Sequence, residues 1–495
     1  MTGHSADYAP LYPLVPAQPA DALADFAGVR TISTDAAYGT DAQLVTALQS
    51  TGTRYIREPT SLPSTTTGVV DQQATWNAVH AIGVRVITRV GKPDGSEGSV
   101  ADFAAYHKYR FASSGVIWAI ENGNEWNKAV MAGGVGQGSG VSPITGRTYG
   151  ASYPLWAEQL AVRQRQMWNA YRLDSALSSI VILGPALVST NTTNAGLLFD
   201  VANVVYSQLN GTPCTTGIAQ YCDYVQFHLY PGQAAAQAVD SVPSWKLDAT
   251  IAATKLQAAG LRDVFCGEAG LHDAVNSSNL NFSAHSPAAA ADYVPRMLLE
   301  HFYRGVKKMV YFELYDDGPD PGNTDQEASF GLIANDWSMK ASGTAWSRML
   351  ALFSDPGTPV TPGLRMAVSG GDAATRWLLF QKRDGTALVA LWRDVSVYDY
   401  TKVSGGSTLA AADLSPAAVT VTVNLNDTAT VSTYKPTSSG TATAVGNVAS
   451  FTVALAGEVV VAKVVPIAAN PPATANNVLP TSLPFALAGA DTTTP

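Results

Sequence analysis

The chain has 495 residues, of which 30 are basic and 39 are acidic, so its formal net charge is −9. This balance argues against nucleic acid or an anionic membrane surface as a partner, because both require a basic face. The sequence contains no run of 18 or more apolar residues, so we expect no membrane insertion. No charged and then apolar signal segment follows Met1. Of the two alternatives, a cytosolic protein or an exported one whose signal has been removed, we favour a secreted, extracellular protein.

Residues 1–27 are rich in Pro and Ala and are expected to form an extended lead-in. Over residues 28–355, short apolar runs alternate with longer stretches of helical periodicity. Because strands that alternate with helices form parallel sheets, eight such units predict a closed (β/α)₈ TIM barrel, with an open doubly wound sheet as the alternative. The predicted strands are 28–33, 54–57, 84–90, 116–122, 180–183, 224–230, 264–268 and 308–315.

The sequence changes character near residue 355, where an Asp-Pro-Gly segment ends the last predicted helix. Beyond it only strand patterns recur, and the turn Asp384-Gly385 between two of them predicts a β-hairpin. We therefore predict a small β-sandwich domain over residues 356–466. Residues 467–495 are rich in Pro, Ala and Thr and are expected to be a tail or linker.

The three cysteines do not have the spacing of a metal site. Cys214 and Cys222 flank a short loop, and either a disulfide or two unpaired thiols fits this spacing. Cys266 lies in an apolar stretch and is expected to be buried. No glycine-rich nucleotide fingerprint follows the first strand, so we expect neither a metal nor an organic cofactor.

Polar residues gather where three of the predicted strands end, and in such barrels this is the end that carries the active site. Asn124-Glu125 follows the fourth strand, and Glu268 ends the seventh. His228 and Tyr230 at the end of the sixth strand are two residues apart and therefore share a face. Two carboxylates that face each other across a barrel mouth suit acid/base and nucleophilic chemistry at an acetal.

These motifs resemble clan A of the glycoside hydrolases, which are retaining TIM barrels with two catalytic glutamates. Arg57 at the end of the second strand fits the same pattern. The stretch 311–318, with Phe330-Gly331 after it, looks like the strand-eight region of family 39 and related bacterial exopolysaccharide hydrolases. The resemblance covers about residues 28–355.

The resemblance implies a role for each residue. Glu125 would be the general acid/base and Glu268 the nucleophile, while Asn124 would hydrogen-bond the sugar hydroxyl beside the anomeric carbon. Tyr230 would donate to Glu268, and His228 would line the pocket.

Arg57 would lie near Glu268 and lower its pKa through its charge. The alternative for Arg57 is a structural ion pair with Glu58 or another acid. The alternative for His228 is a hydrogen-bonded core histidine, and that for Tyr230 is simple packing.

Three aromatic residues, Trp126, Phe312 and Tyr315, are candidates for stacking on sugar rings. Two positions depart from the clan's pattern. Strand eight often ends in Trp, whereas Phe312 and Glu313 stand there in this chain, and strand alternation would let only one of the two face the interior. Trp126 stands where many relatives have Pro.

The sequence thus predicts a retaining glycoside hydrolase acting on a polysaccharide or oligosaccharide. The alternative is a non-catalytic polysaccharide-binding protein on the same barrel. The sugar, the linkage, endo or exo action and the oligomeric state are not predicted.

Overall fold

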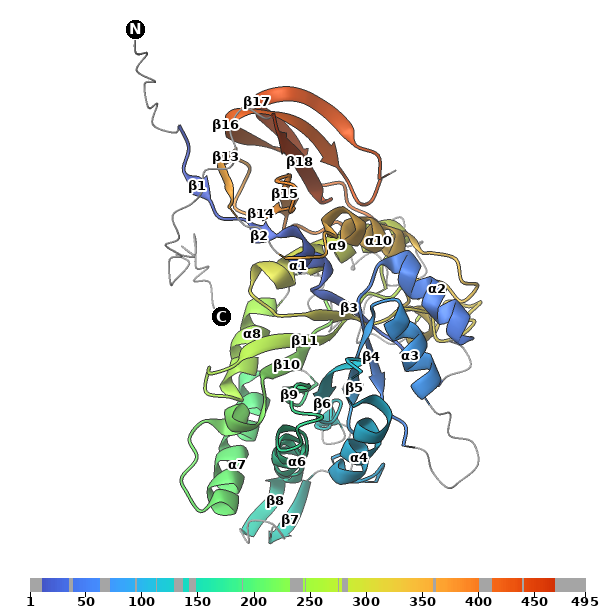
Figure 1. Ribbon diagram of the computed structural model, residues 1–495, viewed down its shortest axis with the longest axis vertical. Coiled ribbons are helices and arrows are strands. Elements are labelled where there is room, and N and C mark those ends of the chain that lie inside the picture. The colour runs from blue at the N-terminus through green and yellow to red at the C-terminus, as the bar shows by residue number, and fades with distance from the viewer. Residues whose placement is uncertain are drawn as a thin grey trace.

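The computed structural model has a barrel of strands ringed by helices, with a β-domain against one side (Figure 1). It describes residues 11–34, 39–62, 72–93, 96–112, 114–128, 137–141, 148–188, 190–231, 244, 246–274, 276–277, 284–358, 362–399, 412–438 and 440–467. Of the predicted tail, all but residue 467 lies outside the described residues.

The barrel is closed by eight strands, and every neighbouring pair is parallel. All eight lie where the sequence predicts strands, which confirms the (β/α)₈ barrel. In chain order they are β3 (Ala27–Arg30), β4 (Tyr55–Pro59), β5 (Arg85–Arg89), β6 (Ile117–Glu121), β9 (Val181–Leu183), β10 (Tyr224–His228), β11 (Asp263–Ala269) and β12 (Met309–Tyr311).

Helices connect the strands, and local sequence sets their ends. Thr40 and Gln43 form a capping box at the start of α2, and Gly52 ends this helix with a φ of 70°. The larger helices of the described chain are α2 (Asp41–Thr51), α3 (Gln73–Ala81), α4 (Val100–Phe111), α6 (Leu155–Arg172), α7 (Thr192–Asn210), α8 (Leu247–Leu256), α9 (Pro287–Tyr303) and α10 (Ala341–Phe353). After β6, a hairpin of β7 (Gln137–Val141) and β8 (Thr148–Pro154) precedes α6.

Apolar side chains inside the barrel form a cluster that includes Tyr55, Ala119 and Phe265. Two residues further along their strands stand Arg57 and Glu121, which share the inward face because strand side chains alternate. On these strands the inward-facing side chains are thus apolar first and become polar towards the carboxyl ends.

The β-domain predicted after residue 355 is present, and its strands join in one mixed sheet of eight. They are β13 (Leu364–Gly370), β14 (Thr375–Gln381), β15 (Ala387–Arg393), β16 (Val419–Tyr434), β17 (Thr443–Leu455) and β18 (Val460–Pro466), with β1 (Leu14–Val15) and β2 (Gln18–Pro19) from the N-terminal segment. β1 pairs with β13 and β2 with β14, so the lead-in is not simply extended but contributes two short edge strands to this domain. A short helix, α1 (Ala20–Ala24), then leads into the barrel.

The β-domain packs on α9 and α10, and one apolar core runs through both parts (Figure 1). Phe380 of β14 lies against Phe302 and Phe353, with ring centroids 5.4 and 4.8 Å apart. The indole of Trp392 donates to Glu300 Oε1 at 2.5 Å. These buried contacts join the β-domain firmly to the barrel.

The cysteines are all buried and unpaired, so Cys214 and Cys222 form no disulfide, and Cys266 is buried as predicted. Among the helices that the structure describes, none combines the length and the apolar character needed to span a bilayer.

Candidate active site

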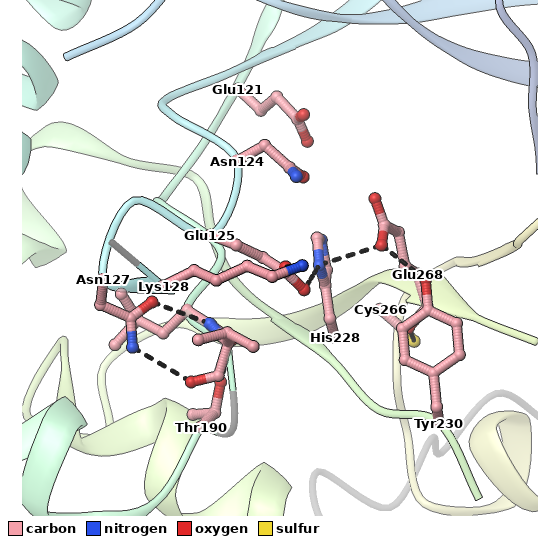
Figure 2. A network of polar contacts seen from close by, with 12 residues as sticks. Glu121, Asn124, Glu125, Asn127, Lys128, Thr190, His228, Tyr230, Cys266 and Glu268 are labelled. Atoms are coloured by element: carbon pink, nitrogen blue, oxygen red, sulfur yellow. Dashed lines mark hydrogen bonds and ion pairs between the residues drawn. The ribbon is translucent and has the colours of Figure 1, made fainter. Parts of the chain in front are cut away.

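The polar residues that end four barrel strands meet at one mouth of the barrel. Figure 2 shows the side chains of Glu125 and Glu268 on either side of His228, with Tyr230 below Glu268 in this view. Arg57 of β4 reaches the same cluster. The sequence-predicted residues on β4, β6, β10 and β11 are therefore brought together.

Glu268 is buried, with 5% of the residue exposed, and two side chains donate hydrogen bonds to it. Arg57 Nη1 donates to Oε1 at 2.6 Å and the Tyr230 hydroxyl donates to Oε2 at 2.6 Å, while His228 Nδ1 lies 3.3 Å from Oε2. Burial alone would raise the pKa of this carboxyl, but the charges of His228 and Arg57 and the Tyr230 hydrogen bond outweigh it and lower the pKa to about 2. Glu268 is therefore held ionised.

The donors themselves keep their protons. Burial, and then the charges of Glu268 and Glu125, raise the pKa of Tyr230 well above its ordinary value, so its hydroxyl remains a donor. Burial opposes the charge of Arg57, but Glu121 and Glu268 outweigh it and raise the pKa of the guanidinium.

Glu125 sits on a turn that is tied to the chain after β9. Its φ of 48° is uncommon for a residue other than glycine, and such conformations cluster at functional sites. Its amide donates to the Ala186 carbonyl at 3.1 Å. Asn127 accepts from the Val188 amide at 2.9 Å and donates to the Val188 carbonyl at 3.1 Å. These bonds fix the direction in which Glu125 leaves the strand end.

The Glu125 carboxylate faces His228 and a lysine that the sequence analysis did not single out. His228 Nδ1 lies 3.0 Å from Glu125 Oε1, and Lys128 Nζ lies 3.7 Å from Oε2. The Glu125 side chain is 12% exposed and that of Glu268 is 7% exposed, so Glu125 stands slightly nearer to solvent, beside the exposed Lys128.

His228 is the residue that lies between the two carboxylates. One oxygen of each glutamate and one ring nitrogen of His228 all lie within 4.8 Å of one another. Gly267 allows the ring to approach, since a Cβ there would stand 2.9 Å from His228 Nε2. His228 thus does more than line the pocket, because one nitrogen faces both acids.

The same three donor atoms are close enough together to hold a divalent cation. However, Arg57 and Tyr230 already donate to the oxygens of Glu268, and Lys128 stands beside Glu125. The contacts therefore favour two carboxylates that are each held by neighbouring side chains over a metal centre.

Arg57 also binds two residues of the chain around strand β6. Its Nε and Nη2 donate to the two oxygens of Glu121 at 2.9 and 2.6 Å, and Nη2 donates to Asn124 Oδ1 at 2.7 Å. The alternative, a structural ion pair, is therefore present beside the contact with Glu268, and the acid that forms it is Glu121. Glu58 instead accepts hydrogen bonds from Ser33, Gln72 and Trp76.

Only one of the three aromatic candidates packs beside this cluster. Phe312 contacts Tyr230 edge-to-face, with centroids 5.9 Å apart. Trp126 instead packs against the helical core and donates from Nε1 to Gln159 Oε1 at 2.8 Å. Tyr315 is buried, stacks on Trp337 at 4.4 Å, and donates its hydroxyl to the Asn335 carbonyl.

Arg30 and Glu313 form a further pair that the sequence analysis missed. Arg30 Nη1 donates to Glu313 Oε2 at 2.6 Å, its guanidinium lies 4.6 Å from the centre of the Phe312 ring, and its charge helps to lower the pKa of Glu268. Because β12 ends at Tyr311, strand alternation does not govern the two residues after it. The signal for Arg30 was its place as the last residue of the first barrel strand.

Comparison of the sequence with family models and with curated proteins gives no match. Among solved structures, the chain is similar to a family 39 glycoside hydrolase from the gut symbiont Bacteroides cellulosilyticus WH2, with a TM-score of 0.51 and 12% identity over 91% of this chain and 81% of that one. It is also similar to a glucosidase from Croceicoccus marinus, with a TM-score of 0.56 and 12% identity over 92% of this chain and 97% of that one. At this identity the likeness establishes a shared fold, so the chain has the barrel architecture of these glycosidases.

Proposed function

We propose that the protein is a retaining glycoside hydrolase that cleaves a polysaccharide or oligosaccharide by double displacement. The observation that carries the proposal is that oxygens of Glu125 and Glu268 lie within 4.8 Å of each other. Retaining enzymes place their two carboxyl groups about 5–5.5 Å apart, whereas inverting enzymes leave about 6.5–9.5 Å for a water molecule. Those separations are between carboxyl groups, so the closeness of one pair of oxygens agrees with the retaining arrangement, and the anomer of the first product decides between the two.

Glu268 is the nucleophile in this proposal. Arg57 and Tyr230 each donate to one of its oxygens at 2.6 Å, and its lowered pKa keeps it charged at neutral pH. Its carboxylate attacks the anomeric carbon and forms a glycosyl ester, while Glu125 gives a proton to the leaving oxygen. Glu125 suits this role because it stands nearer to solvent.

The second half of the reaction reverses these roles. Glu125 takes a proton from water, the resulting hydroxide attacks the anomeric carbon, and Glu268 leaves as a carboxylate. The negative charge of the pair thus moves from Glu268 to Glu125 when the ester forms, and back when it breaks. Because His228 Nδ1 lies 3.0 Å from Glu125 and 3.3 Å from Glu268, the same N–H can donate to whichever acid is charged.

Two more residues position the sugar. Arg57 can only donate, so it must face the amide oxygen of Asn124, which leaves the amide NH₂ free to donate to the hydroxyl beside the anomeric carbon. Phe312, beside Tyr230, supplies an aromatic wall. Secretion of the protein is also part of the proposal.

A reducing-end assay over plant and bacterial polysaccharides and aryl glycosides, with the Glu268→Gln variant beside the wild type, tests the proposal. We expect hydrolysis by the wild type alone, and NMR of the first product should show the anomer of the substrate. Full activity of the Glu268→Gln variant would end the assignment, and the opposite anomer would exclude a retaining mechanism. Binding of a polymer without release of reducing ends would instead support a non-catalytic binding protein.

A further inference from the structure

Glu121 is a buried glutamate at the last position of β6, four residues before Glu125. It is 1% exposed, so it lies beneath the two glutamates of the site and is not open to solvent. Both of its oxygens accept hydrogen bonds from one guanidinium, that of Arg57, at 2.9 Å from Nε and 2.6 Å from Nη2. This two-point contact fixes the plane of the guanidinium as well as its position.

A guanidinium has five N–H groups in a rigid plane, and fixing that plane aims the others. In Arg57, Nη1 then points at Glu268 Oε1, at 2.6 Å, and Nη2 also reaches Asn124 Oδ1, at 2.7 Å. One side chain therefore orients both the carboxylate of Glu268 and the amide of Asn124, and Glu121 sets the orientation of that side chain.

Charge balance does not explain why Glu121 is there. Glu268 alone would neutralise Arg57, and a second buried carboxylate on the same guanidinium adds a desolvation cost. It also brings a second negative charge close to the acid that has to stay ionised. The two-point geometry is what Glu121 adds.

We propose that Glu121 is a positioning residue of the active site, which acts through Arg57 on Glu268 and Asn124 and does not touch the substrate. The proposal rests on the function assigned above. If the proposal holds, the reaction depends on the position of the Glu121 carboxylate as well as on its charge.

Two substitutions separate place from charge. Glu121→Gln keeps the shape but puts an NH₂ against a donor of Arg57, so one of the two bonds is lost. Glu121→Asp keeps the charge but draws the carboxylate back by one methylene. Glu58, on β4, provides the matched controls Glu58→Gln and Glu58→Asp, because it is also 1% exposed and hydrogen-bonded but contacts other residues.

Crystal structures of the four variants and their kcat/KM on the best aryl glycoside form the test. Since a shift of about 1 Å in a catalytic group can cost about 10²-fold, we expect both Glu121 variants to lose about 10²-fold in kcat/KM, with the Arg57 contacts to Glu268 and Asn124 broken or lengthened. Discrimination against the 2-deoxy glycoside should fall as well, because Asn124 is no longer aimed. The Glu58 variants should keep wild-type kinetics even where their melting temperature drops.

Three results would overturn the proposal. They are wild-type kcat/KM in Glu121→Asp, unchanged Arg57 contacts in both Glu121 structures, or equal kinetic losses in the Glu58 controls. If the wild type cleaves no glycoside but the Glu121 structures show Arg57 displaced, the positioning role stands and the glycosidase proposal fails. The structural readout therefore distinguishes the two.

Discussion

Removal of the Tyr230 hydroxyl should move the acid limb of the pH–rate profile. This hydroxyl donates to Glu268 Oε2 at 2.6 Å and stabilises the charged form, so its loss raises the pKa of Glu268 from about 2. A hydrogen bond to a charged group contributes about 1.5–3 kcal/mol. At about 1.4 kcal/mol per pKa unit, the Tyr230→Phe variant should raise this pKa by roughly 1–2 units.

The assay is kcat/KM on an aryl glycoside from acidic to neutral pH, because this ratio reports the ionisation of the free enzyme. We expect the acid limb of Tyr230→Phe to lie roughly 1–2 pH units above that of the wild type. Tyr171→Phe is the matched control, since this buried hydroxyl contacts His107 Nδ1 at 2.8 Å instead of Glu268. An unshifted limb in Tyr230→Phe, or equal shifts in both variants, would refute the reasoning.

Three further outcomes are expected. Arg57→Lys replaces a planar fork by a single ammonium that cannot serve Glu121, Asn124 and Glu268 together, so kcat/KM should fall by about 10²-fold, and wild-type kinetics would contradict this. The pKa of Glu268 is lowered from 4.5 to about 2, so its ionisation stabilises the fold above pH 4.5 and this contribution is lost as the pH falls towards 2. In urea titrations over that pH range, the unfolding free energy of the wild type should therefore fall by roughly 3 kcal/mol more than that of Glu268→Gln. Equal falls in the two proteins would contradict this prediction. Trp392→Phe removes a donor from the buried carboxylate of Glu300 and should lower the unfolding free energy by about 1–3 kcal/mol without changing kcat/KM, whereas a kinetic change would show that the β-domain reaches the active site.

The barrel could be predicted from the sequence because its signals are local and repeated. Each barrel strand is a short apolar run, and each stands before a helical period. Parallel strands bring their carboxyl ends to one mouth, so polar residues at the ends of β6, β10 and β11 had to approach one another. For this reason Glu125, His228 and Glu268 could be grouped although 143 positions separate the first from the last.

The pairings within the site could not be predicted in the same way. Strand alternation gives the face of a residue but not its partner, so Arg57 had both Glu58 and Glu268 as candidate acids. The strands β1 and β2 were missed because each has two residues and prolines surround them. Their pairing depends on the exposed edges of β13 and β14, which lie more than 340 residues away, counting from Val15 to Leu364.

Trp126 and Tyr315 show the limit of reading aromatic residues by position alone. Both lie just after a barrel strand, where a ring can face either the cleft or the helical layer. Trp126 finds a hydrogen-bond acceptor on α6, and Tyr315 finds a stacking partner in Trp337. The indole N–H of Trp or the hydroxyl of Tyr turns the ring towards a hydrogen-bond acceptor, and tertiary packing determines where that acceptor lies.

The two glutamates are made different by what surrounds each of them. Glu268 ends a strand inside the barrel, where Arg57, Tyr230 and His228 converge on its oxygens. Glu125 lies on a turn beyond its strand, where it meets His228 and the exposed Lys128. In the proposed reaction, this difference separates the charged nucleophile from the group that exchanges protons with solvent. Because His228 faces both acids, the protein can stabilise the charge on either one without moving its backbone.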